Sequence, residues 1–258
     1  MQRLAVAVVL SLGLIGLARP LSAHGVAADI PLASGGSQRV LFASPANPRA
    51  ILIMFPGGSG IVDISAGGTS TNRNFLVRTL PLWLAQGFAV AILSSPNGGS
   101  LLGQRHTSAY VAAIDRAIDF ARSRGNASVW LVGTSQGSTA AANGAAHLGT
   151  KIAGIVLSSS VTRRTQAGET VFDSEPGLIA VPALVIANQG DTCRGTPPGD
   201  AATLAAALTR SPRKEVIIVA SDQIQSDPCE AMSPHGYLGI EPMVVQRISD
   251  WIRSTSPR

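Results

Sequence analysis

The stretch "VWLVGTSQGS" at residues 129–138 decides how the fold is read from the sequence. An apolar run stops abruptly at Gly133, and the polar Ser135 stands between that glycine and Gly137. A strand that runs through G-x-S-x-G into a helix is the setting of a serine raised on a sharp turn at the carboxyl end of the strand. An ordinary loop is the alternative, and the rest of the chain has to decide between the two.

Apolar and amphipathic segments alternate along the chain. Strands are predicted for seven runs that are apolar almost throughout: 39–44, 50–55, 88–94, 128–133, 152–158, 183–188 and 215–221. Continuously apolar strands are typical of a sheet covered on both faces. Helices are predicted for the segments between them: 71–87 (interrupted by Pro81), 107–125, 137–149, 200–210 and 241–253. This alternation predicts an α/β fold, a three-layer α/β/α sandwich around a mostly parallel central sheet.

The composition indicates a single compact domain over residues 24–258. Hydrophobic residues make up 45% of the chain and charged residues 14%, which excludes a disordered protein. The formal net charge of +5 comes from scattered Lys and Arg residues without a basic run, so nucleic acid is not an expected partner. We expect a monomer that acts on a small molecule.

Residues 1–23 are expected to be a secretory signal peptide. Arg3 precedes the apolar core "LAVAVVLSLGLIGLA", and Ala23 is the small residue before the expected cut. The core has about 15 residues where a membrane span needs about 20, so a retained membrane anchor is the weaker interpretation. Export would place the protein outside the cell or in the periplasm, where Cys193 and Cys229 would form a disulfide in preference to two free thiols.

A reactive serine at position 135 needs a base. His235 is the best candidate, because it lies in a turn-rich loop between the last predicted strand and the last helix, at the edge of the sheet where Ser135 would emerge. His106 follows the 88–94 strand and could line a pocket, whereas His147 lies on the helix after the serine and reads as an ordinary surface or core residue.

The base in turn needs a carboxylate that fixes its tautomer. Asp191 is favoured because it follows the 183–188 strand, next to the strand that leads to His235. Asp222 and Asp227 are the competitors, and a loop aspartate in a local turn is the alternative for all three. A Cys193–Cys229 bridge would join the two loops that carry the acid and the histidine.

An oxyanion needs preplaced hydrogen-bond donors. The glycine-rich "MFPGGSG" follows the 50–55 strand, and the backbone N–H groups of Gly58, Ser59 and Gln136 are the expected donors. A glycine-rich turn without function is the alternative for this loop. No nucleotide-binding glycine motif follows the first strand, and no His, Cys or Asp spacing indicates a metal, so no cofactor is expected. An N-terminal His24 could chelate copper after signal cleavage, as in lytic polysaccharide monooxygenases, but those are β-sandwiches.

The chain resembles the α/β-hydrolase superfamily in its motifs and in the order of its candidate residues. The candidates follow one another as Ser135, Asp191 and His235, and the motifs are "GTSQG" after a strand and "FPGGSG" earlier in the chain. The resemblance covers nearly the whole chain after residue 23. It implies a sheet of about eight strands and serine-based acyl transfer. In that chemistry Ser135 attacks a carbonyl, His235 moves the proton, Asp191 orients His235, and water cleaves the acyl-enzyme.

Two departures from the superfamily pattern affect what the resemblance implies. Pro56 stands where many lipase-like members carry histidine, and residues 159–182 leave little room for a helical cap. The expected function is therefore an exported, capless serine hydrolase acting on carboxylic esters. A non-catalytic binding protein of the same fold, or a peptidase, thioesterase or perhydrolase with the same triad, is the alternative.

Overall fold

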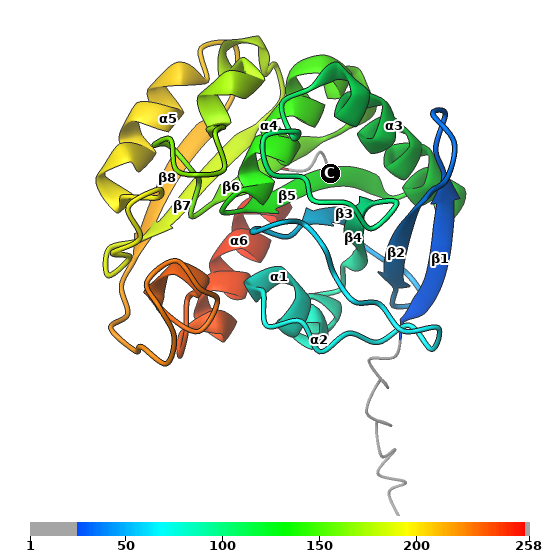
Figure 1. Cartoon of the computed structure of the whole chain (residues 1–258), viewed down its shortest axis with the longest axis horizontal. Coiled ribbons are helices and arrows are strands. Elements are labelled where there is room, and N and C mark those ends of the chain that lie inside the picture. The colour runs from blue at the N-terminus through cyan, green and yellow to red at the C-terminus, as the bar shows by residue number, and fades with distance from the viewer. Residues whose placement is uncertain (1–24, 256–258) are drawn as a thin grey trace, which may run out of the picture.

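A computed structural model describes residues 25–255 and contains one eight-stranded sheet (Figure 1). The strand order is β1-β2-β4-β3-β5-β6-β7-β8. The pairs β1/β2 and β2/β4 are antiparallel, and every other pair is parallel. The strands are β1 (Val26–Pro31), β2 (Ser37–Ala43), β3 (Ala50–Phe55), β4 (Ala89–Pro96), β5 (Ser128–Thr134), β6 (Gly154–Ser158), β7 (Ala183–Asn188) and β8 (Lys214–Val219). The predicted signal peptide and His24 lie outside the described residues.

Helices cover both faces of the sheet, as the α/β/α prediction requires (Figure 1). One face packs against α3 (Ser108–Ser123), α4 (Gly137–Leu148) and α5 (Ala201–Ala207). The other packs against α1 (Phe75–Arg78), α2 (Leu80–Ala85) and α6 (Glu241–Thr255). The predicted three-layer sandwich is confirmed.

The two hydrophobic cores explain why the central strands are apolar at every position. Successive side chains of a strand point to opposite faces. In β5, Leu131 joins the core beneath α3 and α4, whereas Trp130 joins the core beneath α6. Trp130 also packs edge-to-face against Trp251 of α6, with ring centroids 5.7 Å apart. Because both faces are covered, a polar side chain in β5 would be buried on either side.

Two elements differ from the sequence-based expectation. Strand β1 was not predicted, because Val26–Pro31 contains Asp29 and Pro31 and lies at the sheet edge, where Ile30 is its one buried residue. The predicted 71–87 helix is two short helices separated at Thr79, with Pro81 in the first turn of α2, where proline is tolerated.

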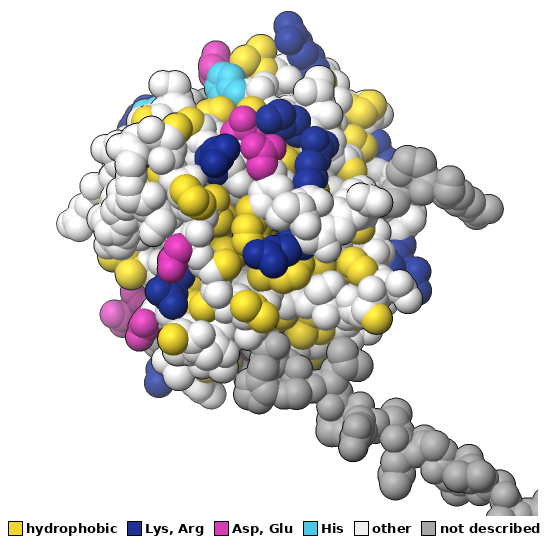
Figure 2. Space-filling model, turned by 90° about the vertical axis from the view of Figure 1, so that its right-hand side faces the viewer, with side chains coloured by type: hydrophobic (Ala, Val, Ile, Leu, Met, Phe, Trp, Pro, Cys, Tyr) yellow, Lys and Arg dark blue, Asp and Glu magenta, His cyan; other side chains and the backbone are white. Residues whose placement is uncertain are grey.

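The face of the molecule beside β1 and β2 carries Lys and Arg interspersed with Asp and Glu among uncharged side chains (Figure 2). No helix within residues 25–255 combines the length and the apolar character that crossing a bilayer requires.

Candidate active site

Ser135 occupies the turn between β5 and α4 with a left-handed backbone, φ +55°. Its N–H donates to the carbonyl of Ser158 at 2.9 Å, which anchors the turn to the end of β6. A non-glycine residue in this region is strained, so the surroundings must impose the conformation.

Two glycines allow the chain to close around the serine. A Cβ on Gly133 would lie 2.2 Å from the carbonyl oxygen of Gly137, and a Cβ on Gly137 would lie 1.8 Å from that of Phe55. Neither position can carry a side chain unless the backbone moves. The G-x-S-x-G spacing is therefore a packing requirement of the turn.

His235 and Asp191 form a buried hydrogen-bonded pair. The His235 Nδ1 to Asp191 Oδ2 distance is 2.9 Å, and the residues are 5% and 6% exposed. Thr196 lies against both, because its hydroxyl donates to Asp191 Oδ2 at 2.8 Å and lies 3.1 Å from His235 Nδ1. The second carboxylate oxygen accepts the N–H of Cys193 at 2.9 Å.

Loop backbones around the pair are also hydrogen-bonded. The Ser159 hydroxyl donates to the carbonyl of His235 at 3.0 Å, and the Asn188 amide donates to the carbonyl of Pro234 at 2.7 Å. Tyr237 donates to the carbonyl of Ile186 at 3.1 Å, and burial raises the pKa of its hydroxyl to about 12, so it stays neutral. These contacts fix the position of the loop that carries His235 (residues 220–240, here called the histidine loop) against the ends of β6 and β7.

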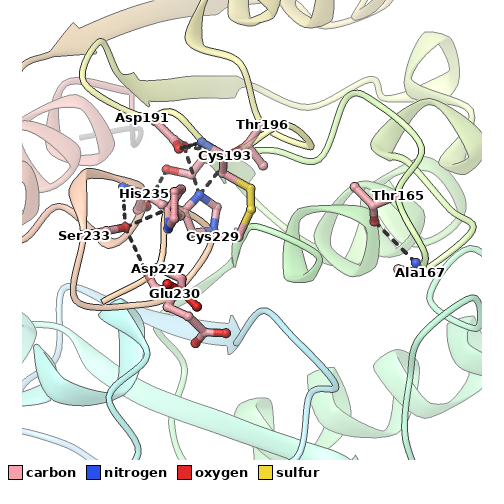
Figure 3. The surroundings of a disulfide bond; sticks show 12 residues. Thr165, Ala167, Asp191, Cys193, Thr196, Asp227, Cys229, Glu230, Ser233 and His235 are labelled. Carbon is pink, nitrogen blue, oxygen red and sulfur yellow. Dashed lines mark hydrogen bonds and ion pairs between the residues drawn. A yellow bond between two sulfur atoms is a disulfide. The ribbon is translucent and has the colours of Figure 1, made fainter. Parts of the chain in front are cut away.

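A disulfide joins Cys193 to Cys229 beside this pair (Figure 3). Figure 3 shows Asp191, Thr196 and His235 clustered on one side of the bridge, with the chain around residues 227–230 running past it. The bridge therefore links the loop that carries the acid to the loop that carries the histidine.

Ser135 and His235 line the same cavity, which has a volume of about 330 Å³. Residues 56–59 form one wall, residues 72–75 a second, and residues 229–231 a third. Within residues 25–255 the Ser135 hydroxyl makes no hydrogen bond to the imidazole. Catalytic hydrogen bonds are often long in the absence of substrate and tighten in the complex.

The expected oxyanion donors are positioned unequally around this cavity. Gly58 and Ser59 line it, whereas Gln136, at the start of α4, is buried and does not. In the described part of the chain, the N–H groups of all three have no hydrogen-bond acceptor. A Cβ on Gly57 would lie 2.8 Å from the Ser135 Cβ, so the loop after β3 packs directly on the serine.

Solved structures with the same architecture are numerous, although no protein-family model and no curated protein matches the chain. An esterase of Pyrococcus furiosus superimposes with a TM-score of 0.64 at 11% identity, covering 90% of this chain and 91% of that one. A lidless serine hydrolase of Xanthomonas campestris gives 0.62 at 14%, covering 91% and 96%. A dienelactone hydrolase of Anabaena variabilis gives 0.61 at 14%, covering 90% and 98%. The chain has the α/β-hydrolase fold.

The remaining histidines and carboxylates considered from the sequence lie elsewhere in this α/β-hydrolase fold. His106 pairs with Glu169, Nδ1 to Oε2 3.0 Å, and does not line the cavity. His147 lies 3.6 Å from Glu175, and Asp222 and Asp227 are exposed loop residues.

Asp191, Cys193 and His235 also offer ligand atoms within 4.8 Å of one another. The Cys193 sulfur is bonded to Cys229, and the other two side chains are bonded to each other. The chemistry of this group fits an acid–imidazole pair better than a metal site.

The sequence did not indicate the side chains that hold the walls of the candidate site in place. Arg78 donates to the carbonyls of Gly236 at 2.5 Å and Arg73 at 2.8 Å, and pairs with Glu241 at 2.9 Å. It thus connects the cavity wall at 72–75 with the histidine loop and α6. No motif marks such a residue, since its role depends on contacts between distant segments.

Proposed function

We propose that the protein is an exported serine hydrolase that cleaves carboxylic esters through an acyl-enzyme. Ser135 Oγ attacks the ester carbonyl carbon while His235 takes its proton. The alkoxide then leaves with that proton, and water, activated by the same imidazole, releases the acid. Asp191 holds the imidazole in the productive tautomer. The N–H groups of Gly58 and Ser59 at the cavity wall, with that of Gln136 directly after the serine in the chain, stabilise the oxyanion.

One observation carries this proposal: a serine in a strained left-handed turn lines the same cavity as His235, whose imidazole is hydrogen-bonded to the buried Asp191. Strained backbone and buried ionisable pairs are both costly to folding, and they concentrate at functional sites. A binding protein of this fold would need neither the strained serine nor the buried His235–Asp191 pair.

The structural neighbours and the short 159–182 segment favour small or extended esters as substrates. The neighbours are described as esterases, a dienelactone hydrolase and a serine hydrolase without a lid. Between β6 and β7 this chain has only the 3-10 turns Val171–Ser174 and Pro176–Leu178. A site without a helical cap admits substrates from solvent without an opening step.

The test is labelling with a fluorophosphonate probe. Wild type should be labelled and Ser135→Ala should not, while Ser123→Ala, which removes an exposed hydroxyl at the end of α3, should behave as wild type. Labelling that persists in Ser135→Ala would overturn the assignment of the nucleophile.

The substrate class is tested with matched p-nitrophenyl esters from acetate to laurate, a thioester and a peptide p-nitroanilide. We expect kcat/KM to be highest for esters with short acyl groups. Preferential cleavage of the thioester or the anilide would replace esterase with thioesterase or peptidase. Export is tested by N-terminal sequencing of the mature protein, which we expect to begin near residue 24.

A further inference from the structure

A buried ion pair lies behind the loop after β3. The side chains of Arg105 and Glu169 are 1% and 0% exposed, with Nη1 and Oε1 3.7 Å apart. Glu169 also accepts the N–H groups of Gly103 at 3.1 Å and Arg105 at 3.0 Å, and contacts His106 at 3.0 Å. Glu169 lies in the short segment 159–182 between β6 and β7.

Burying this pair is not explained by stability alone. Removing two charges from water costs several kcal/mol, and apolar replacements of buried pairs are often as stable as the native residues. Desolvation lowers the pKa of Arg105, while Tyr110 and Glu169 act in the opposite direction. The role of Arg105 therefore has to be inferred from the hydrogen bonds that its guanidinium makes to groups other than Glu169.

The guanidinium reaches from the pair to the loop that lines the cavity. Arg105 Nη2 donates to the carbonyl of Gly58 at 2.8 Å, and Nη1 donates to the carbonyl of Leu101 at 3.3 Å. A Cβ on Gly60 would lie 2.9 Å from Arg105 Nη2, so the loop backbone packs directly on the charged group.

Gly58 needs such a restraint more than its neighbours. Its φ is +59°, and the space where a Cβ would stand is empty to 4 Å, so no side-chain packing fixes its conformation. Three successive carbonyls hold the loop instead: Gly57 accepts from the Gly60 N–H, Gly58 from Arg105, and Ser59 from the Leu101 N–H. Arg105 supplies the only side-chain bond of the three.

Within a trans peptide unit the C=O and the following N–H point in opposite directions. The bond from Arg105 draws the Gly58 carbonyl toward the interior and so turns the N–H of Ser59 away from it. We propose that Arg105, held by Glu169, is a positioning residue that fixes the Gly58–Ser59 peptide so that its single donor, the N–H of Ser59, serves the oxyanion. This inference rests on the proposed serine hydrolase function.

The test compares kcat, KM and affinity for phenylboronic acid, whose boron forms a tetrahedral adduct with a nucleophilic serine. The variants are Arg105→Met and Arg105→Met/Glu169→Met, the second of which leaves no unpaired charge. We expect both to lower kcat for p-nitrophenyl acetate by about 10- to 100-fold and to weaken boronate binding in proportion, with KM within about 3-fold of wild type. A residue that merely stabilises the fold would not produce this split.

One control variant and one further test variant complete the experiment. Lys151→Met removes an ion pair with Asp115 far from the cavity and should retain wild-type kcat. Arg105→Lys keeps the charge beside Glu169, and therefore the fold, but a single ammonium cannot span both Glu169 and Gly58, so kcat should still fall.

Each outcome decides one question. Wild-type kcat and boronate affinity in a folded double variant, or in Arg105→Lys, would overturn the positioning role and leave the esterase proposal intact. A rise in KM with unchanged boronate affinity would also overturn it. A wild-type protein that neither hydrolyses esters nor is labelled at Ser135 would overturn the proposed function, and this inference with it.

Discussion

The left-handed backbone of Ser135 is possible because two neighbouring residues are glycines without side chains. Gly133 and Gly137 leave room for the chains at the start of α4 and the end of β3, which lie where their side chains would be. A non-glycine residue in this region costs roughly 1–3 kcal/mol, which the surrounding sheet must offset. The serine is presented at the sheet edge because the two glycines make this turn possible.

Gly137→Ala should therefore destabilise the whole fold. The new Cβ would lie 1.8 Å from the carbonyl oxygen of Phe55, a backbone atom that cannot rotate away. We expect a loss of about 3 kcal/mol or more in the free energy of unfolding, measured by urea titration. Gly125→Ala, where nothing lies within 4 Å of the Cβ position, should stay within about 0.5 kcal/mol of wild type. Equal stability of the two variants would contradict the packing argument.

Thr196→Val tests how much the threonine hydroxyl contributes to the buried His235–Asp191 pair. The substitution keeps the shape of the side chain but removes the hydroxyl that donates to Asp191 Oδ2 and contacts His235 Nδ1. Losing one hydrogen bond to a charged group should lower kcat/KM about 10-fold. Thr209→Val, an exposed threonine near α5, should have no effect on ester hydrolysis. An unchanged rate in Thr196→Val would show that Asp191 and the loop bonds orient His235 without the hydroxyl.

At the scale of elements, the sheet positions the site and the loops carry it. Parallel strands end at one edge, so the loops after β3, β5 and β7, together with the histidine loop that follows β8, converge there. The Cys193–Cys229 bridge fastens two of these loops to each other across 36 residues of chain.

The double variant Cys193→Ser/Cys229→Ser should lose both stability and activity. A loop of this length corresponds to roughly 4 kcal/mol in the chain-entropy account, an upper figure. Urea titration should show a lower midpoint, and ester hydrolysis should fall because the acid and histidine loops are no longer joined. Treatment with dithiothreitol should move wild type toward the variant and leave the variant unchanged. Identical midpoints for both proteins would show that the bridge contributes nothing to stability.

The ion pair between Arg163, in the loop after β6, and Asp200, just before α5, should give a pH-dependent contribution to stability. The Arg163 side chain lowers the pKa of Asp200 below its ordinary 3.8 through a 3.0 Å hydrogen bond, burial opposes this, and Thr162 adds a second bond. A depressed carboxyl pKa stabilises the fold above pH 3.8, and the contribution is lost as the pH falls through the folded-state pKa.

Asp200→Asn should therefore be slightly less stable than wild type at neutral pH, and the difference should be small because Arg163 is largely exposed. Thermal unfolding measured from pH 7 down to about pH 2 should show the two proteins converging below pH 3.8. A difference that stays constant over this range would mean that the ion pair is not its source.

At the scale of the whole molecule, both cores share one sheet and should unfold together. All three tryptophans, Trp83, Trp130 and Trp251, lie in the core beneath α1, α2 and α6, whereas circular dichroism follows helices on both faces. We expect the urea transitions followed by fluorescence and by circular dichroism to coincide. A fluorescence transition at distinctly lower urea would show that the α6 face opens on its own.

The overall fold could be predicted because covered strands leave a continuous apolar run, and all seven predicted runs overlap strands of the sheet. Strand β1 could not, since an exposed edge strand with Asp29 and Pro31 shows neither continuous apolar character nor a clear alternation. The order of strands depends on packing between distant segments, which the periodicity of any one segment does not record.

The candidate site could be predicted only where a sequence motif or the edge of the predicted sheet marks a residue. Ser135 carries a motif, and Asp191 and His235 follow from the edge at which parallel strands end. Arg105 and Glu169 carry no such signal, because an arginine and a glutamate in loops ordinarily lie in water, and only the tertiary structure shows them buried together.

The Cys193–Cys229 bridge also determines how cleavage of a single peptide bond would affect this protein. It closes the chain between those residues, including α5, β8 and the exposed stretch 222–225, into a covalent ring. A protease that cuts once inside the ring opens it but releases nothing: Asp191 stays on one fragment, His235 on the other, and the two sulfurs hold the fragments together. A single cut between Cys193 and Cys229 would therefore leave the loops that carry Asp191 and His235 covalently joined.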